Sequence, residues 1–232
     1  MKLAIQHKWD LTFQEAQHLQ KELQSRVDLS TTLELPQIHI VAAADISYSR
    51  KSQWLFGVVV LVRFPEMTLL ATYANRMKTH FPYVPGYLSF REVPVLIPIF
   101  EKIETEFDVI LCDGQGIAHP RRFGLASHVG VLLDKPAIGC AKSRLIGTYQ
   151  EPGPLKGDFS DLMDGAERIG MVLRTRDRVK PLFISPGHKM DFDTARKITL
   201  ACVQRYRIPE PLRLAHQIVN KIRAQETEGI VS

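Results

Sequence analysis

Cysteines are few in this sequence, and long apolar runs are absent. The three cysteines lie too far apart for a Cys-x-x-Cys zinc site, and each has apolar neighbours: Cys112, Cys140 and Cys202. The N-terminus, MKLAIQHKWDLT, lacks the apolar core and cleavage site of a secretory signal, and no stretch approaches the length of a membrane span. These absences predict a soluble, cytoplasmic protein with buried, reduced thiols and no membrane partner.

Domain linkers, internal repeats and low-complexity segments are also missing. A chain of 232 residues is long enough to bury a sizeable core, so we expect residues 1–232 to form a single domain and a monomer. The formal net charge is +5 and the sequence pI is about 9.1. This modest basic excess suits a polyanionic partner such as nucleic acid, but it does not identify one.

Hydrophobic patterns predict a helix, three strands, and then strands that alternate with helices. Thr12 and Glu15 have the spacing of a capping box and open an amphipathic helix. Strands are expected at 38–46, 56–63 and 67–75, with connections too short for crossover helices, which predicts an antiparallel meander. The later elements are expected as follows: a loop at 82–92, a helix at 93–103 kinked by Pro98, a strand at 109–112, a helix at 123–133, a strand at 137–141, a loop at 147–157, strands at 170–176 and 180–184, and helices at 192–206 and 212–225.

This order of elements is that of an α/β, ribonuclease-H-like fold. Its mixed sheet combines an antiparallel three-stranded meander with parallel strands, and helices flank it. In that topology the first and fourth strands are neighbours. Asp45, near the end of the first strand, and Asp113, directly after the fourth, would then lie close enough to share one cation.

The stretch 109–147 concentrates residue types that carry chemistry. A buried strand, VILC, ends at Asp113, and Gly114 and Gly116 follow at the sheet edge where open α/β sheets bind ligands. Basic residues come next: His119, Arg121 and Arg122. A carboxylate beside cations that favour phosphate is typical of a phosphodiester site, although a glycine turn followed by a solvated basic loop would have the same local pattern.

Four stretches of the chain resemble endonuclease V, the metal-dependent nuclease of inosine-containing nucleic acids. They are AADISY at 43–48, PYVPGYLSFRE at 82–92, DGQGIAHPRRFGLASHVGVLLDKPAIGCAKSRLIG at 113–147, and RLAHQIVN at 213–220. Together they run through most of the chain in the order of that family. Gln115 departs from the family pattern, in which histidine is more usual, and this change concerns the lining of the base pocket more than the chemistry.

The resemblance implies a catalytic set of Asp45, Glu92, Asp113, His216 and Lys142. The first four would hold Mg²⁺, and we expect Mn²⁺ to substitute. His216 would bind a second metal or assist the attacking water, and Lys142 would contact the scissile phosphate or that water. Locally, Asp45 also fits a turn, Glu92 a helix N-terminus, and Lys142 a solvated surface. His216 lies off the apolar stripe of its helix, which indicates solvent or a polar cleft rather than the core.

The resemblance also implies a wedge that enters the base stack, formed by Pro82, Tyr83, Val84 and Pro85. A tyrosine packed on the core beneath a proline turn is the structural alternative. Four residues would line the pocket that holds the displaced base: Gly86, Leu88, Gly114 and Gly116. His119 and Arg121 are candidates for phosphate contact, as is Arg122.

The implied function is a metal-dependent endodeoxyribonuclease. It would recognise deoxyinosine in single- or double-stranded DNA, hydrolyse the second phosphodiester bond 3′ to the lesion, and so initiate repair. Two alternatives stay open: an inosine-specific endoribonuclease, and a ribonuclease-H-like binding module without catalysis. The complete set of Asp45, Glu92, Asp113 and His216 argues against the inactive module.

Overall fold

Three consecutive strands form an antiparallel meander at one side of the sheet. They are β1 (Ile40–Tyr48), β2 (Trp54–Arg63) and β3 (Thr68–Lys78) in the computed structural model, which describes residues 1–48, 53–79 and 81–228. β2 is a run of buried apolar residues, whereas β3 alternates in burial because only one of its faces packs against the core, through Ala71, Tyr73 and Met77. Most of the connection predicted between the first two strands, YSRKSQ at 48–53, lies outside the described residues, which leave out 49–52.

Within the described residues, eight strands form one sheet in the order β3-β2-β1-β4-β5-β8-β7-β6. β1 pairs in parallel with β4 (Val109–Cys112), and β4 pairs in parallel with β5 (Ala137–Ala141). The remaining strands are antiparallel: β6 (Phe159–Asp164), β7 (Glu167–Leu173) and β8 (Leu182–His188). The predicted mixed sheet and the predicted neighbourhood of the first and fourth strands are both confirmed.

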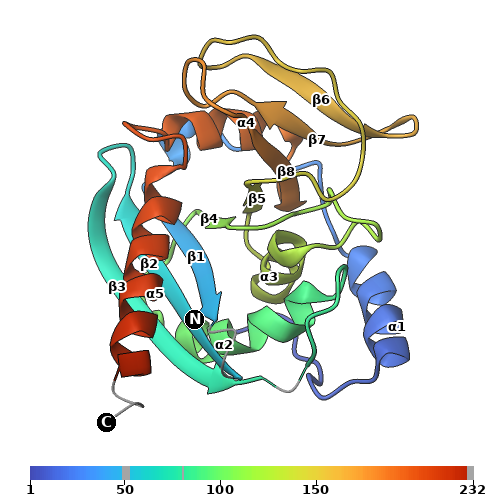
Figure 1. The fold of residues 1–232 in the computed structure, drawn as a ribbon, viewed down its shortest axis with the longest axis vertical. Coiled ribbons are helices and arrows are strands. Elements are labelled where there is room, and N and C mark those ends of the chain that lie inside the picture. Colours follow the sequence, from blue (N-terminus) through green and yellow to red (C-terminus); the bar gives the residue numbers. More distant parts are fainter. Residues whose placement is uncertain (49–52, 80, 229–232) are drawn as a thin grey trace.

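Helices cover the two faces of the sheet and build a core on each (Figure 1). On one face α5 (Glu210–Glu228) packs over β1 and β2, and α4 (Phe192–Ala201) packs over β7 and β8. The other face carries α2 (Leu88–Lys102) and α3 (Leu125–Leu133). α1 (Phe13–Gln24) contacts α3, and it begins at the predicted capping box of Thr12 and Glu15.

Several predicted boundaries are wrong, and β6 was not predicted. α2 begins at Leu88 within the expected loop and contains both Pro94 and Pro98, because the buried stripe on this helix outweighs the cost of the prolines. β6 has the sequence FSDLMD and buries a single residue, so its apolar pattern is weak. The last two expected strands shift to β7 and β8, and the helix expected to reach residue 206 ends at Ala201.

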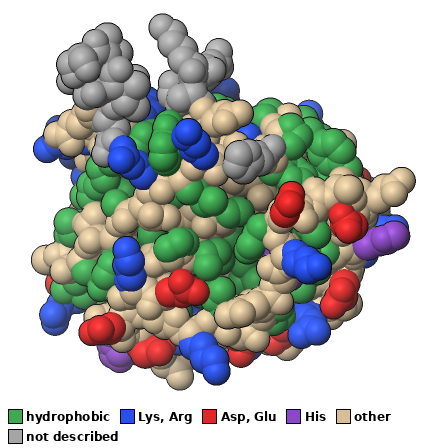
Figure 2. Space-filling view, turned by 90° about the horizontal axis from the view of Figure 1, so that it is seen from below, with side chains coloured by type: hydrophobic (Ala, Val, Ile, Leu, Met, Phe, Trp, Pro, Cys, Tyr) green, Lys and Arg blue, Asp and Glu red, His purple; other side chains and the backbone are tan. Residues whose placement is uncertain are grey.

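The surface of the molecule is mixed in charge. On the face shown in Figure 2, Lys and Arg side chains lie among Asp, Glu and apolar side chains, so the modest basic excess is dispersed there. Within the described residues, no helix combines the length and the apolar character needed to cross a membrane. The three cysteines are free thiols and are buried, as predicted.

Candidate active site

Two carboxylates meet at the edge of the sheet where β1 and β4 run side by side. Ala44 pairs with Cys112, so Asp45 and Asp113 occupy the next position on their neighbouring chains. Side chains alternate along a strand, and Ala43 and Leu111, two residues earlier, belong to the core beneath α5. Both carboxylates are therefore directed to the face that α5 covers.

His216 completes this group from α5. Its Nδ1 donates to Oδ2 of Asp45 at 2.8 Å, since a carboxylate only accepts. The side chain is 53% exposed, while Leu214, Ile218 and Ile222 of the same helix pack against the core. The prediction that His216 is not a core histidine is confirmed.

Asn220 supports the imidazole from the next turn of α5. Its Nδ2 lies 3.2 Å from His216 Nε2, and it also donates to the His216 carbonyl at 2.8 Å. Ser47 donates to Asn220 Oδ1 at 2.9 Å and so links this pair to β1. These contacts orient a histidine that is otherwise half in solvent.

The side chains of Asp45, Asp113 and His216 fit a divalent cation. Each offers one ligand atom, and the three atoms lie within 4.8 Å of one another. Burial raises the pKa of Asp45, and the charge of Asp113 raises it further. A bound cation would relieve this repulsion, because its positive charge favours the ionised form of Asp45.

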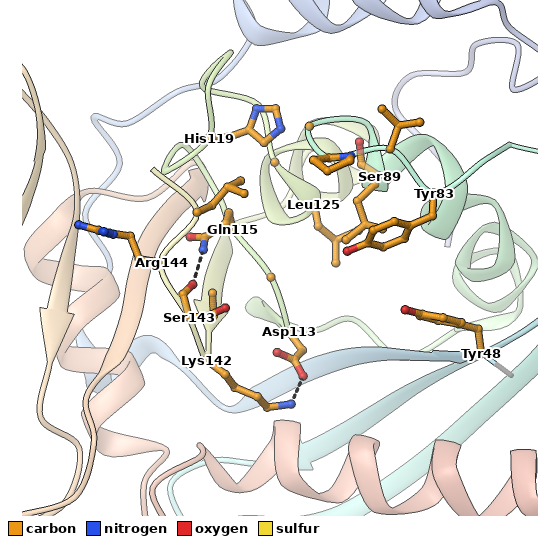
Figure 3. Close-up of a pocket in the computed structure, with 18 residues that line it drawn as sticks. Tyr48, Tyr83, Ser89, Asp113, Gln115, His119, Leu125, Lys142, Ser143 and Arg144 are labelled. Carbon is orange, nitrogen blue, oxygen red and sulfur yellow. Dashed lines mark hydrogen bonds and ion pairs between the residues drawn. The ribbon is translucent and has the colours of Figure 1, made fainter. Parts of the chain in front are cut away.

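Glu92 lies nearby on α2 but is not one of the three converging ligands. Its side chain is 8% exposed, and burial raises its pKa to about 8, with further contributions from the charges of Asp45 and Asp113. Lys142, directly after β5, forms an ion pair with Asp113 Oδ2 (Figure 3). The structure therefore brings all five predicted catalytic residues to one edge of the sheet.

A cavity of about 660 Å³ opens beside Asp113 (Figure 3). Its lining includes seven predicted residues: Tyr83, Val84, Pro85, Gly86, Leu88, Gly114 and His119. Tyr83 is 60% exposed, which excludes the alternative of packing on the core. Gln115, whose departure from the family pattern was expected to concern the lining of the base pocket, also lines the cavity. The remaining lining residues were not singled out as pocket residues: Tyr48, Ser89, Gly124, Leu125, Ala141, Ser143, Arg144 and Leu145, together with the catalytic candidates Asp113 and Lys142.

Three predicted binding residues do not line this cavity: Pro82, Gly116 and Arg121. Gly116 packs against β8, where a Cβ would stand 2.0 Å from the Pro186 carbonyl oxygen, so its missing side chain serves close packing. Pro82 lies on a separate, smaller cavity lined by Trp9 and Phe81 among others.

Arg121 holds the loop that carries Tyr83. Its guanidinium donates to the carbonyl of Gly86 at 2.5 Å, bonds to Gln20 Oε1, and lies 4.3 Å from the ring centre of Tyr87. Gln20 Nε2 also donates to the Gly86 carbonyl, at 3.2 Å. These contacts involve residues far apart in the sequence, which is why no local pattern predicted them.

The other basic residues after Asp113 are also engaged within the protein. His119 is buried, and burial, followed by the charge of Arg121, lowers its pKa to about 4. Arg122 forms ion pairs with Asp164 and Glu167, which flank the β6–β7 turn. At neutral pH His119 is therefore an uncharged side chain.

Gln115 stands in the lining of the cavity and is 9% exposed. Its Nε2 donates to the Ser143 carbonyl at 3.1 Å, whereas its Oε1 is buried without a hydrogen-bond partner among the described residues. The signature position that departs from the family pattern therefore joins the loops after β4 and β5.

Comparison with known proteins places this site in a family. The endonuclease V family model matches residues 21–217. An endonuclease V from Dehalococcoides mccartyi is 47% identical over 216 residues, covering 93% of this chain and 96% of that protein. The crystal structure of an endonuclease V from Streptomyces avermitilis has a TM-score of 0.91 at 37% identity and covers 98% of this chain and 100% of its own.

A further similar structure contains a nucleic acid. It is a variant of endonuclease V from Ciona intestinalis in complex with a 23-mer DNA that contains an inosine followed by a ribo-adenosine. Its TM-score is 0.83 at 30% identity, and the match covers 93% of this chain and 99% of that chain. The family match, the fold and the shared signature stretches agree: this chain belongs to the endonuclease V family and is an endonuclease, a hydrolase of phosphodiester bonds.

Proposed function

We propose that this protein is a metal-dependent endodeoxyribonuclease that recognises deoxyinosine in DNA. It would hydrolyse the second phosphodiester bond 3′ to the lesion and so initiate repair. The observation that carries the proposal is the cluster of Asp45, Asp113 and His216, of which Asp113 also lines a cavity of about 660 Å³. A base displaced from the DNA double helix would occupy the cavity, and the backbone of its strand would then lie beside the carboxylates of Asp45 and Asp113.

Asp45, Asp113 and His216 would hold the cation, and Glu92, which lies near the two aspartates, would be a fourth ligand. When bound, Mg²⁺ or Mn²⁺ would supply positive charge to the phosphate oxygens and a water of lowered pKa. The protein's own groups fix the rest of the arrangement. His216 is oriented by Asp45 and Asn220, and Lys142 presents a cation beside Asp113 that would favour the scissile phosphate.

Tyr83 would act as the wedge. It is exposed on a loop stiffened by Pro82 and Pro85, and Arg121 and Gln20 hold that loop at Gly86. A ring held in this way can fill the gap that a displaced base leaves in a duplex. The base itself would lie against Leu88 and Gly114, where backbone groups reach its edge.

An inosine-specific endoribonuclease is the second candidate. The oligonucleotide bound to the Ciona intestinalis relative has a ribo-adenosine after its inosine. A 2′-hydroxyl is favoured only by a group placed to bond it. Arg121 and Arg122, two basic residues near the site, are engaged within the protein and are not placed to bond a 2′-hydroxyl. We therefore favour the deoxyribose substrate.

Single-turnover cleavage of matched strands tests both candidates. One strand carries deoxyinosine in DNA and the other inosine in RNA, each single- and double-stranded, with Mg²⁺ at fixed salt. We expect the DNA strands to be cut at least as fast as the RNA strands, at the second phosphodiester 3′ to the lesion. A rate on RNA more than about tenfold higher, roughly 1.4 kcal/mol, would assign the protein to RNA.

A further inference from the structure

A chain of hydrogen bonds runs from the N-terminal segment through the interior to the wall of the cavity. It begins at His7, whose Nδ1 lies 2.8 Å from the Lys8 carbonyl oxygen and whose Nε2 lies 2.8 Å from His128 Nε2. It continues from His128 Nδ1 to Ser89 Oγ at 3.0 Å. His128 and Ser89 are buried, and Ser89 lines the cavity from the first turn of α2.

The donor and acceptor of each hydrogen bond follow from the Lys8 carbonyl, which His7 contacts. A carbonyl oxygen only accepts, so His7 carries its hydrogen on Nδ1 and its Nε2 is a lone pair. His128 must then donate from Nε2, which leaves its Nδ1 as a lone pair. The Ser89 hydroxyl therefore donates its one hydrogen to His128.

Protonation of His7 would place a hydrogen on its Nε2 and so reverse the two bonds that His128 makes, to His7 and to Ser89. Burial lowers the pKa of His7 and places that of His128 well below its ordinary value, so both rings are neutral near pH 7. His7 also lies against Trp9, with ring centres 4.2 Å apart, and His128 stacks on Trp9 at 5.3 Å. The aromatic contacts keep the two imidazoles in place.

We infer that Ser89 is a specificity-determining residue whose hydroxyl oxygen accepts a hydrogen bond from the base in the cavity. The inference rests on the proposed function, because it takes the occupant to be a purine. With its hydrogen committed to His128, Ser89 offers only lone pairs to a ligand. Figure 3 shows it near Leu125 and Tyr83, across the cavity from Gln115 and Ser143.

A hydrogen-bond acceptor at Ser89 would distinguish hypoxanthine from adenine. Hypoxanthine carries a hydrogen on ring nitrogen N1, whereas N1 of adenine is a lone pair. The Ser89 oxygen accepts a hydrogen bond from N1 of hypoxanthine, but it faces a lone pair on N1 of adenine. With adenine both groups lose their water without gaining a hydrogen bond. His7 and His128 are positioning residues in this arrangement: they act on the base only through Ser89.

Two substrates differ only at N1: a DNA strand with 2′-deoxyinosine, which has a hydrogen there, and the same strand with 1-methyl-2′-deoxyinosine, which has a methyl group in its place. Both keep the oxygen on C6, and the second lacks the N1 hydrogen. We expect Ser89→Ala to lower the ratio of the two single-turnover rates about tenfold or more, about 1.4 kcal/mol. Ser89→Thr keeps the hydroxyl and should keep the ratio.

Ser127→Ala is the matched control. Ser127 is a fully buried serine next to His128 whose Oγ has no hydrogen-bond partner among the described residues, so its loss should leave the ratio unchanged. His7→Phe keeps a ring beside Trp9 and removes the acceptor for His128, and the ratio should fall part of the way. Thermal unfolding of each variant separates a folding defect from this change in ratio.

The outcomes distinguish the inference from the proposed function. If the wild-type protein does not cut the inosine strand, the proposed function fails. If it does and Ser89→Ala slows both substrates equally, Ser89 contacts the C6 oxygen or acts only in packing, and the inference is overturned. A fall in the ratio that is absent from Ser127→Ala and restored by Ser89→Thr supports it.

Discussion

Asp45 and Asp113 stand at the same level of two neighbouring parallel strands, one position beyond the pair Ala44 and Cys112. The sheet, not the local sequence around either residue, brings their carboxylates together. Burial and the neighbouring charge of Asp113 together raise the pKa of Asp45. This relationship gives the first expectation for the chemistry.

Asp113→Asn and Asp45→Asn should each abolish cleavage and leave lesion binding largely intact. Binding is spread over the cavity and the backbone, whereas the chemistry needs the negative charge that holds the cation. Single-turnover cleavage and a gel-shift titration measure the two effects separately. Asp193→Asn, an exposed residue of α4, is the control. Near wild-type turnover of either variant at saturating Mg²⁺ would contradict a carboxylate-centred mechanism.

Metal exchange gives a second expectation. Removal of divalent ions with a chelator should stop cleavage, and Mn²⁺ should restore it as Mg²⁺ does. Ca²⁺ should support binding with little cutting, because its longer bonds and variable geometry position the water poorly. Cleavage assays across the three ions, with binding measured in parallel, test this. Full activity in the chelator would remove the need for a cation at Asp45, Asp113 and His216.

Tyr83→Ala should weaken discrimination for inosine more in duplex DNA than in single strands. Only a duplex leaves a gap in the stack for the ring to fill, and displacing a base there costs a few kcal/mol. Rates on inosine-containing and matched undamaged strands, both single and double, give the comparison. Tyr206→Ala removes another exposed tyrosine as the control. Equal losses on the two forms of substrate would refute the wedge role.

Arg121→Ala should loosen recognition of inosine without changing the salt dependence of binding. Its guanidinium is committed to Gln20, Gly86 and the ring of Tyr87 rather than to a phosphate. Each lost phosphate contact lowers the slope of log affinity against log salt by about one. Arg144→Ala, an exposed residue at the cavity, is the comparison and should reduce the slope. A reduced slope for Arg121→Ala would show that this residue binds phosphate.

The sequence predicted the parts of this molecule that local patterns encode. Strand runs, the capping box at Thr12 and the polar face that carries His216 all follow from periodicity, and the strand order then predicted the Asp45–Asp113 pair. Contacts between distant segments left no such pattern. The anchoring of Gly86 by Gln20, and the line from His7 to Ser89, depend on how three helices and the N-terminal segment meet. Individual residues in those contacts look like ordinary surface or core positions in the sequence.

Buried histidines should make the protein less stable in acid. The pKa of His119 is about 4 in the folded protein, below the roughly 6.5 of an unfolded histidine. Below pH 6.5 the unfolded chain therefore binds a proton that the folded protein does not, and unfolding is favoured. The contribution of His119 to the free energy of unfolding is therefore fully present above pH 6.5. It decreases by roughly 1.4 kcal/mol per pH unit as the pH falls from 6.5 toward 4.

His119→Asn removes this group, so its free energy of unfolding should fall less between pH 7 and pH 5. The expected difference from wild type is roughly 2 kcal/mol over that interval. Urea unfolding at several pH values measures it, and the comparison cancels the similar contributions of His7, His128 and His188, whose pKa values burial also lowers. If the free energy of unfolding fell equally with pH for wild type and His119→Asn, His119 would take up its proton in the folded protein as readily as in the unfolded chain. That result would contradict the lowered pKa of His119.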